Sequence, residues 1–275
     1  MEKLNTLNKT LHKTELIRLK SNLEEIIIYI YRFRYLNRPQ LQKLLNHKYR
    51  SYILEWLNKL SEQKYLKKYY NPQFAGEPSY YSLGTVGRKY LMRFASELKD
   101  INISELDRVW REGGYSEPFH KHTMFLGYIY LALIELVAKV DEGQGKLKFF
   151  TQTDLKGVEY LINREPDAYF FIEDKNKKSK RYFLEMVQEH ARWKDIQSKV
   201  GKYFTYFKKK IWQDNMKTEF PEIIIVCSNY HQKNGINRHL LEQFKRRRLE
   251  LPFYLTTKIE IKSQGMNGQI LHKVE

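Results

Sequence analysis

Residues 164–203 decide the fold, and they open with Arg164-Glu165-Pro166-Asp167. An apolar run follows to Ile172, and a second one, Tyr182-Phe183-Leu184-Glu185-Met186-Val187, lies beyond a charged break at 174–180. Both runs have the length and composition of strands, and the break between them is rich in turn residues, so the stretch predicts a β-hairpin. A basic amphipathic stretch, 193–212, comes next and predicts a helix within 191–215.

The hairpin would bring two acidic residues together. If it turns about Asn176, residues 167 and 185 face each other, because (167+185)/2 = 176. Cross-strand β-carbons are then about 4.5–5.5 Å apart, and two like charges at that distance are destabilising. A hard cation such as Mg²⁺ would offset the repulsion between Asp167 and Glu185. A register shift of one residue would separate the two acids, and in the plainer alternative each has an ordinary structural role.

This arrangement resembles the PD-(D/E)XK nuclease superfamily. Pro166-Asp167 matches the first motif of that superfamily, and Glu185-Met186-Val187 matches the second. The lysine of the second motif is Val187 in this chain, which puts catalysis in doubt. Lys199, on the following helix, is the candidate for a relocated lysine.

More narrowly, the chain resembles the replication-relaxation family of plasmids and related mobile elements. The resemblance rests on Arg164-Glu165-Pro166-Asp167-Ala168, on the Phe183-Leu184-Glu185 strand, and on Lys199 and Tyr203 four residues apart. It implies an N-terminal winged helix joined to a divergent nuclease-like domain. Val187 departs from this family too, because an acidic residue often stands there.

Composition points to a polyanionic partner. The 275 residues include 49 Lys and Arg against 32 Asp and Glu, a net charge of +17, with 21 Tyr and 15 Phe. Clustered basic charge favours nucleic acid over the general basicity of a lysine-rich proteome. We expect a cytoplasmic protein without a membrane span, because no apolar run approaches 18 residues and no signal-peptide region begins the chain. The lone Cys227 excludes a disulfide framework and is expected to be a buried thiol.

The N-terminal part predicts a winged helix-turn-helix over residues 1–98. Residues 1–20 are polar, and Ser21 with Glu24 has the pattern of a capping box that starts a first helix. Pro39 opens a second helix and residues 49–63 form a third. Strands at 65–70 and 80–83, around a loop with Pro72, Gly76 and Pro78, would form the wing.

The third helix and the wing carry the predicted DNA contacts. In such folds the start of the third helix enters the major groove. Residues 38–70 hold eight basic and two acidic residues, a net charge of +6. The predicted contacts with double-stranded DNA are Lys48, Tyr49, Arg50 and Tyr52 on the helix, with Lys67 and Lys68 on the wing. The alternative is a helical hairpin that only packs domains together.

The rest of the chain predicts a mixed α/β domain over residues 118–275. A helix at 85–98 would return from the wing, and the polar segment 99–117 with Gly113-Gly114 would be a linker. Beyond it, an apolar helix at 125–140, a short strand at 147–151, the hairpin, the helix at 191–215 and a buried strand at 223–227 give the order αβββαβ. The fold class is therefore α/β, a winged helix followed by a PD-(D/E)XK-like mixed sheet.

Catalysis would depend on three residues. Asp167 and Glu185 would bind Mg²⁺, and Lys199 would supply positive charge beside a phosphodiester. His122, just before the apolar helix, could ligate metal or contact phosphate, since relatives often carry a histidine there. His120 could act in the same way, although a surface role is the plainer reading of both.

The sequence thus leaves three functions open. The first is a sequence-specific protein that binds double-stranded DNA, in the replication or transfer of a plasmid or mobile element, with a degenerate nuclease-like domain. The second is a Mg²⁺-dependent DNA endonuclease that the winged helix targets. The third is a protein-docking adaptor. Val187 favours the first over the second, and clustered basic charge favours both over the third. Replication or transfer proteins are further candidate partners, and a homodimer stays open.

Overall fold

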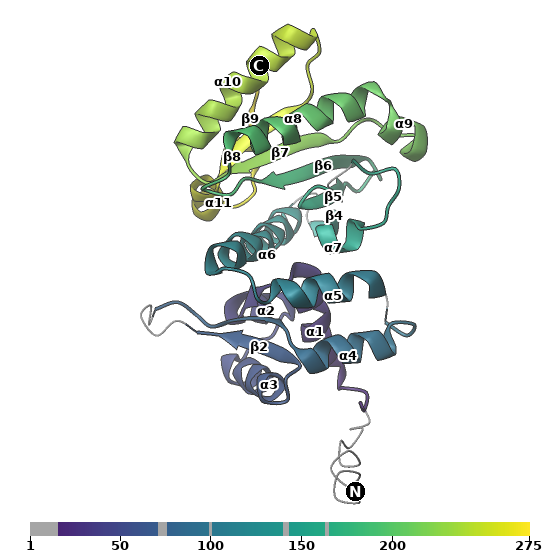
Figure 1. Ribbon diagram of the computed structural model, residues 1–275, viewed down its shortest axis with the longest axis vertical. Coiled ribbons are helices and arrows are strands. Elements are labelled where there is room, and N and C mark those ends of the chain that lie inside the picture. The colour runs from purple at the N-terminus through teal and green to yellow at the C-terminus, as the bar shows by residue number, and fades with distance from the viewer. Residues whose placement is uncertain (1–15, 71–75, 99–100, 140–142, 163–164) are drawn as a thin grey trace, which may run out of the picture.

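The computed structural model describes residues 16–70, 76–98, 101–139, 143–162 and 165–275. A winged helix forms the lower part of the molecule, a mixed sheet with its helices forms the upper part, and the long helix α6 lies between them (Figure 1). Of the predicted features, Arg164, Pro72 and most of the N-terminal polar segment lie outside the described residues. The fold class is confirmed as mixed α/β.

The winged helix contains a three-stranded antiparallel sheet in the order β1-β3-β2. Its elements are α1 (Ser21–Phe33), β1 (Leu36–Asn37), α2 (Arg38–Leu44), α3 (Arg50–Glu62), β2 (Leu66–Tyr69), β3 (Tyr80–Leu83) and α4 (Thr85–Phe94). The predicted third helix and both wing strands are confirmed to within about a residue at most ends. The helix predicted at 85–98 ends earlier, at Phe94.

The helix starts follow capping chemistry, with one correction. Asn37 caps α2 and forms a capping box with Gln40, with Pro39 in the first turn as predicted. At α1 the predicted box is wrong, because Lys20 is the N-cap and no side chain caps the helix. The Glu24 carboxylate instead pairs with Arg18, outside the helix.

The predicted linker at 99–117 contains a packed helix, α5 (Ile103–Glu112). Leu106 and Val109, three residues apart, are buried on one face of it. Arg108 pairs with Glu112 one turn away at 2.6 Å. The segment predicted as a linker therefore contains an amphipathic helix that packs on its neighbours.

The upper part contains a six-stranded sheet in the order β4-β5-β6-β7-β8-β9, parallel from β6 to β8 and antiparallel elsewhere. Its elements are α6 (Glu117–Val137), β4 (Lys146–Thr151), α7 (Gln152–Leu155), β5 (Ala168–Glu173), β6 (Ser179–Met186), α8 (Trp193–Lys208), α9 (Ile211–Met216), β7 (Glu222–Cys227), α10 (Tyr230–Arg247), β8 (Phe253–Thr257), α11 (Lys258–Gln264), the 3₁₀ helix η2 (Gly268–Ile270) and β9 (His272–Lys273). The predicted order αβββαβ is present with two short additional helices, α7 between β4 and β5 and α9 after α8. The single helix predicted at 191–215 is wrong, because Lys210 adopts a left-handed conformation (φ 52°) and divides α8 from α9.

The hairpin register agrees with the prediction. Ala168 pairs with Leu184 and Glu173 pairs with Ser179, so the residue numbers of each pair sum to 352. The same sum joins positions 167 and 185, with Asn176 at the centre of the turn. The two acids are therefore neighbours across the strands.

One face of the sheet shares its core with the winged helix. Side chains of α1, α3, α5 and α6 form a single apolar cluster with one face of β5, β6 and β7. Helix α6 approaches the winged helix closely at Gly127, where a β-carbon would lie 2.5 Å from Leu36. A second cluster lies between the other sheet face and helices α8 and α10. Arg32 of α1 adds a polar link, since it pairs with Asp154 of α7 at 3.0 Å.

Two predictions from composition concern burial and membranes. Cys227 is a free thiol, fully buried at the end of β7. Burial raises the pKa of its thiol to about 12, which keeps the sulfur protonated. No helix within the described ranges combines the length and apolarity that crossing a bilayer requires.

Candidate functional site

The two predicted acids meet at the carboxyl end of β6. Asp167 lies one residue before β5, and Glu185 lies within β6 with only 2% of its surface exposed. Strand alternation turns Glu185 and Val187 to the same face, toward α8, where Val187 packs in the second apolar cluster. Val187 therefore occupies the position of the motif lysine with an apolar side chain.

Helix α8 provides a lysine, Lys199, near the position where the motif lysine is replaced by Val187. Lys199 and Tyr203 are four residues apart and so share one helix face. The Lys199 ammonium contacts Glu185 Oε2 closely and lies 3.6 Å from Asp167 Oδ2. Tyr203 Oη donates a 2.7 Å hydrogen bond to Glu185 Oε1. The structure thus brings together Asp167, Glu185 and Lys199, with Lys199 between the two acids.

The positive charge of Lys199 reduces the repulsion between the buried carboxyl groups of Asp167 and Glu185. Burial, with a contribution from Asp167, raises the pKa of Glu185 to about 7, although Lys199 opposes the rise. Burial also acts to raise the pKa of Asp167, but Lys199 and the Met186 N–H, which donates to Asp167 Oδ2 at 2.7 Å, hold it below its ordinary value. Burial opposes the charge on Lys199, yet the two carboxylates raise the pKa of its ammonium. The site is an internally neutralised cluster.

The carboxylates offer oxygen ligands of the kind that Mg²⁺ takes, but they are not free for it. One oxygen of Glu185 accepts from Tyr203, one oxygen of Asp167 accepts from Met186 N–H, and Lys199 contacts both side chains. In the described ranges no three His, Cys, Asp or Glu side chains form a group that could hold a metal ion. With Lys199 in this position, the pair does not fit a metal site.

An open cavity of about 590 Å³ surrounds the acids. The side chains that line it include ion pairs, among them Lys156 with Glu165 at 3.1 Å and Arg192 with Asp195 at 2.8 Å. The cations of this cavity are thus largely paired with its acids. Glu165 belongs to the motif quoted above, whereas Lys156 and Arg192 lie in segments without periodicity and could not be placed from sequence.

The two histidines of α6 lie inside the helix rather than before it. His122 lines the cavity, and burial lowers the pKa of its imidazole to about 4 despite the nearby Asp167. It is therefore neutral at pH 7. His120 lies apart, with its ring stacked 4.3 Å from that of Tyr35 and Nδ1 3.2 Å from the Tyr80 hydroxyl. His120 and His122 therefore cannot bind one metal ion or phosphate together.

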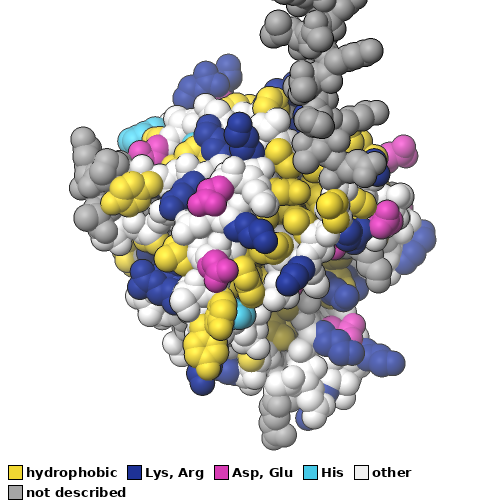
Figure 2. Space-filling view, turned by 90° about the horizontal axis from the view of Figure 1, so that it is seen from below, with side chains coloured by type: hydrophobic (Ala, Val, Ile, Leu, Met, Phe, Trp, Pro, Cys, Tyr) yellow, Lys and Arg dark blue, Asp and Glu magenta, His cyan; other side chains and the backbone are white. Residues whose placement is uncertain are grey.

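The start of α3 forms an exposed basic and aromatic surface. Lys48, Tyr49, Arg50 and Tyr52 are all exposed, the two tyrosines by 55% and 51%. The ring of His47 meets those of Tyr49 and Tyr52 edge-on, and the two tyrosines also meet each other. Seen from below, Lys and Arg side chains are spread over this end of the molecule among exposed hydrophobic side chains (Figure 2). The four predicted helix residues therefore share one accessible surface.

The two predicted wing lysines point to opposite sides of β2. Lys68 lies toward α3, with its ammonium 3.4 Å from Asn58 Oδ1. Lys67 turns away from α3 and donates a 2.9 Å hydrogen bond to the carbonyl of Gly113. Lys68 therefore lies beside the exposed surface of α3, whereas Lys67 is engaged with the end of α5, and the predicted DNA contacts of both stay predictions.

Comparisons with known proteins agree with the sequence resemblance. The model of the replication-relaxation family matches residues 28–223. Among solved structures, the chain is similar to the adhesin competence repressor of Streptococcus pyogenes, at 19% identity and a TM-score of 0.26, over 49% of this chain and 96% of that one. No curated protein matches. Since the family model spans more than half of the sequence, including most of the winged helix, both acids and Lys199, the chain belongs to the replication-relaxation family.

Proposed function

We propose that this protein binds double-stranded DNA through its winged helix and serves replication in a plasmid or mobile element. The observation that carries the proposal is the exposed basic start of α3 with Lys68 of the wing beside it. A helix of this kind can enter the major groove with its first residues at the base edges. The net charge of +17 adds long-range attraction to the phosphate backbone.

The sheet domain is proposed to be a PD-(D/E)XK-like fold that does not cleave. The order αβββαβ and the acid pair across the hairpin support this relationship. Lys199 stands between the acids where a metal would have to bind, and position 187, where the motif has its lysine, is a valine. Loss of one donor beside the reacting phosphate costs about 10²–10³ in rate. The domain would then serve as a platform for DNA or for replication and transfer proteins.

The two parts are arranged so that one duplex could touch both. Strands β6, β7 and β8 run parallel, and α11, which directly follows β8, lies at the left of the molecule in Figure 1. The wing projects to the same side. The carboxyl end of β6, with its acidic site, therefore faces the side on which a duplex would contact the wing.

Salt dependence provides the direct test of DNA binding. A library of duplexes should yield a bound site, and its affinity should fall steeply with salt, by a slope of about −0.9 per phosphate contact in a log–log plot. Fluorescence anisotropy between 50 and 300 mM KCl measures this slope. An affinity that does not change with salt, or an absence of binding at low salt, would contradict the proposal.

A Mg²⁺-dependent endonuclease is the second candidate, and one observation favours it. Asp167, Glu185 and Lys199 converge in a single open cavity, although they come from three separate elements. If Lys199 withdrew, the two carboxylates would offer oxygens to Mg²⁺, which would polarise a phosphodiester. Lys199 would then be free to stabilise charge on the phosphate.

Plasmid cleavage separates the two candidates. We expect little or no nicking of plasmid DNA with Mg²⁺ or Mn²⁺. In calorimetry, wild type and Asp167→Ala should give the same result, with no heat that can be assigned to a metal bound at Asp167. Robust nicking that disappears in Asp167→Ala, Glu185→Ala and Lys199→Ala would establish the endonuclease instead. Nicking that survives all three changes would come from a contaminant or from a site elsewhere in the protein, and a second purification that removes it would identify the contaminant.

A further inference from the structure

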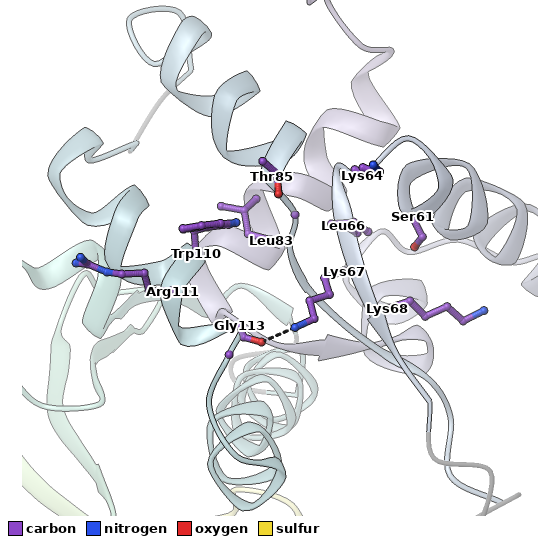
Figure 3. A pocket seen from close by; sticks show the side chains of 12 residues that line it. Ser61, Lys64, Leu66, Lys67, Lys68, Leu83, Thr85, Trp110, Arg111 and Gly113 are labelled. Carbon is purple, nitrogen blue, oxygen red and sulfur yellow. Dashed lines mark hydrogen bonds between the residues drawn. The ribbon is translucent and has the colours of Figure 1, made fainter.

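A second cavity, of about 650 Å³, lies at the base of the wing, away from the acidic site (Figure 3). The end of α3, strand β2, the start of α4 and the end of α5 enclose it. Its volume falls in the range of small-molecule sites, about 300–1,000 Å³. Of the residues that line it, Lys68 also belongs to the proposed DNA surface, and the remainder of the cavity has no role in the functions discussed above.

Its lining contains four cations and no acid. Lys64, Lys67, Lys68 and Arg111 line it, without any Asp or Glu. Within the described residues, the side chains of Lys64 and Arg111 take part in no hydrogen bond or ion pair, and Lys67 bonds only to the Gly113 carbonyl. The acidic site differs, because there the cations are paired with carboxylates. Unneutralised positive charge around a cavity favours an anionic ligand.

The four cations differ in their positions. Figure 3 shows Lys67 reaching across the middle of the cavity to Gly113, whereas Lys68 and Arg111 extend outward on opposite sides. The charge is thus spread along the cavity. A ligand with several phosphate oxygens matches this distribution better than a single carboxylate.

An apolar wall completes the cavity. Trp110 is 39% exposed and lies beside Leu83, which is buried (Figure 3). The Arg88 guanidinium lies 5.5 Å from the centroid of the Trp110 ring and also pairs with Asp107, so the indole is held in place. An exposed, fixed indole offers a surface on which a flat ring can stack.

The start of α4 adds the positive end of a ten-residue helix. Gly84 is its N-cap and provides no side-chain cap, and both Gly84 and Thr85 line the cavity. A β-carbon at Gly84 would lie 2.3 Å from the Lys64 carbonyl oxygen, so glycine is needed for this close approach. Two N–H groups at this end are already taken, because Gly84 N–H donates to the Tyr65 carbonyl at 2.8 Å and Val86 N–H donates to the Lys64 carbonyl at 2.9 Å. The helix start therefore adds only the positive end of its dipole to the charge of the cavity.

We propose that this cavity binds a free nucleotide, with its phosphates at Lys64 and Lys67 and its base against Trp110. The ligand would compete for the Lys67 ammonium with the Gly113 carbonyl, which also accepts a 2.6 Å hydrogen bond from Tyr69 of β2. Nucleotide binding would therefore change how the wing is attached to α5. Only this effect on the wing rests on the proposed function, because nucleotide binding itself requires no DNA.

Calorimetric titration of ATP into the full-length protein tests the site. Lys64→Ala/Lys67→Ala should weaken ATP binding at least tenfold. Lys208→Ala/Lys209→Ala, which removes the same charge at the end of α8, should leave it unchanged. Trp110→Ala should weaken ATP but not pyrophosphate, with circular dichroism as the check on folding. In a duplex-binding assay, ATP should shift wild-type affinity and leave the Lys64→Ala/Lys67→Ala variant unaffected.

Several results would overturn the proposal. No ATP binding at millimolar concentration would do so, as would equal losses in the two double variants. Pyrophosphate binding as tight as ATP and indifferent to Trp110→Ala would mean an adventitious ion only. A single-stranded oligonucleotide that binds through Trp110 and is not displaced by ATP would assign the cavity to a nucleic-acid strand. If the protein binds ATP but no duplex DNA, the nucleotide site would stand and the proposed function would be refuted.

Discussion

Lys48→Ala/Arg50→Ala should weaken duplex binding by about 10- to 100-fold and leave folding intact. Both side chains are exposed at the start of α3, and neither forms an ion pair in the described part of the chain. One good arginine contact to a base edge is worth about 1–3 kcal/mol. If both residues contact phosphate instead, the log–log salt slope should become shallower by about 1.8. Anisotropy over a salt series measures both quantities.

A matched variant makes this result specific. Lys208→Ala/Lys209→Ala removes the same charge from the far end of α8, and should change affinity less than threefold. Equal losses in the two variants would mean that net charge alone holds the duplex, which would refute a role for α3. Unchanged binding in Lys48→Ala/Arg50→Ala would place the DNA site elsewhere.

Lys199→Met should destabilise the protein in a pH-dependent way, by about 2 kcal/mol at pH 8 and by much less at pH 5. Breaking a fully buried ion pair costs about 3–5 kcal/mol, and the 36% exposure of the Lys199 side chain reduces that value. Without the ammonium, burial and Asp167 together raise the pKa of Glu185 further. Urea unfolding at pH 5, 6, 7 and 8 measures the effect.

The direction of the pH dependence follows from the proton on Glu185. Its folded pKa, about 7 in wild type, lies above the value of about 4.3 in an unfolded chain. The stability from this group is complete below the unfolded pKa and is lost as the pH rises through the folded one. In Lys199→Met the folded pKa of Glu185 should be higher than in wild type, so the stability contributed by the protonated carboxyl should be lost over a range that extends to higher pH.

Two further variants test the cause. Lys199→Met/Glu185→Gln should recover most of the stability at pH 8, since the amide carries no charge and can still accept from Tyr203. Lys194→Met, at an exposed position on the same helix, should have almost no effect. A loss that is the same at every pH would indicate packing rather than charge and would contradict this account.

The strand register was accessible from sequence because apolar alternation and turn residues act locally. The charged break fixed the turn at Asn176, and alternation then placed Asp167 beside Glu185. Lys199 was a candidate because of the family resemblance and not because of the alternation. Alternation along the strands could not predict that the Lys199 ammonium lies between Asp167 and Glu185, because that position depends on how α8 packs against the sheet.

Other features depended on partners far away in the chain. Nothing near Lys67 shows that its side of β2 faces Gly113, 46 residues later. Helix α5 was missed because polar residues outnumber Leu106 and Val109 in it. Its charges are neutralised partly within the helix, by Arg108, and partly from outside it, by Arg34 and Arg88. Ser21 has the local pattern of a cap, yet the Glu24 carboxylate accepts a hydrogen bond from the hydroxyl of Tyr90, 66 residues later. In each case a tertiary contact overrides the local signal.

The apolar cluster shared by the winged helix, α6 and the sheet has a consequence for the evolution of this protein. Modular regulators exchange their DNA-reading halves by recombination, because a flexible joint lets either half fold alone. Here Gly127 fits closely against Leu36, and the apolar faces of α1 and β6 belong to one interior. A recombinant protein with a winged helix from another protein would also need an α6 whose surface fits that winged helix. New binding specificity in this lineage should therefore arise by point substitution at the start of α3 rather than by exchange of the whole winged helix.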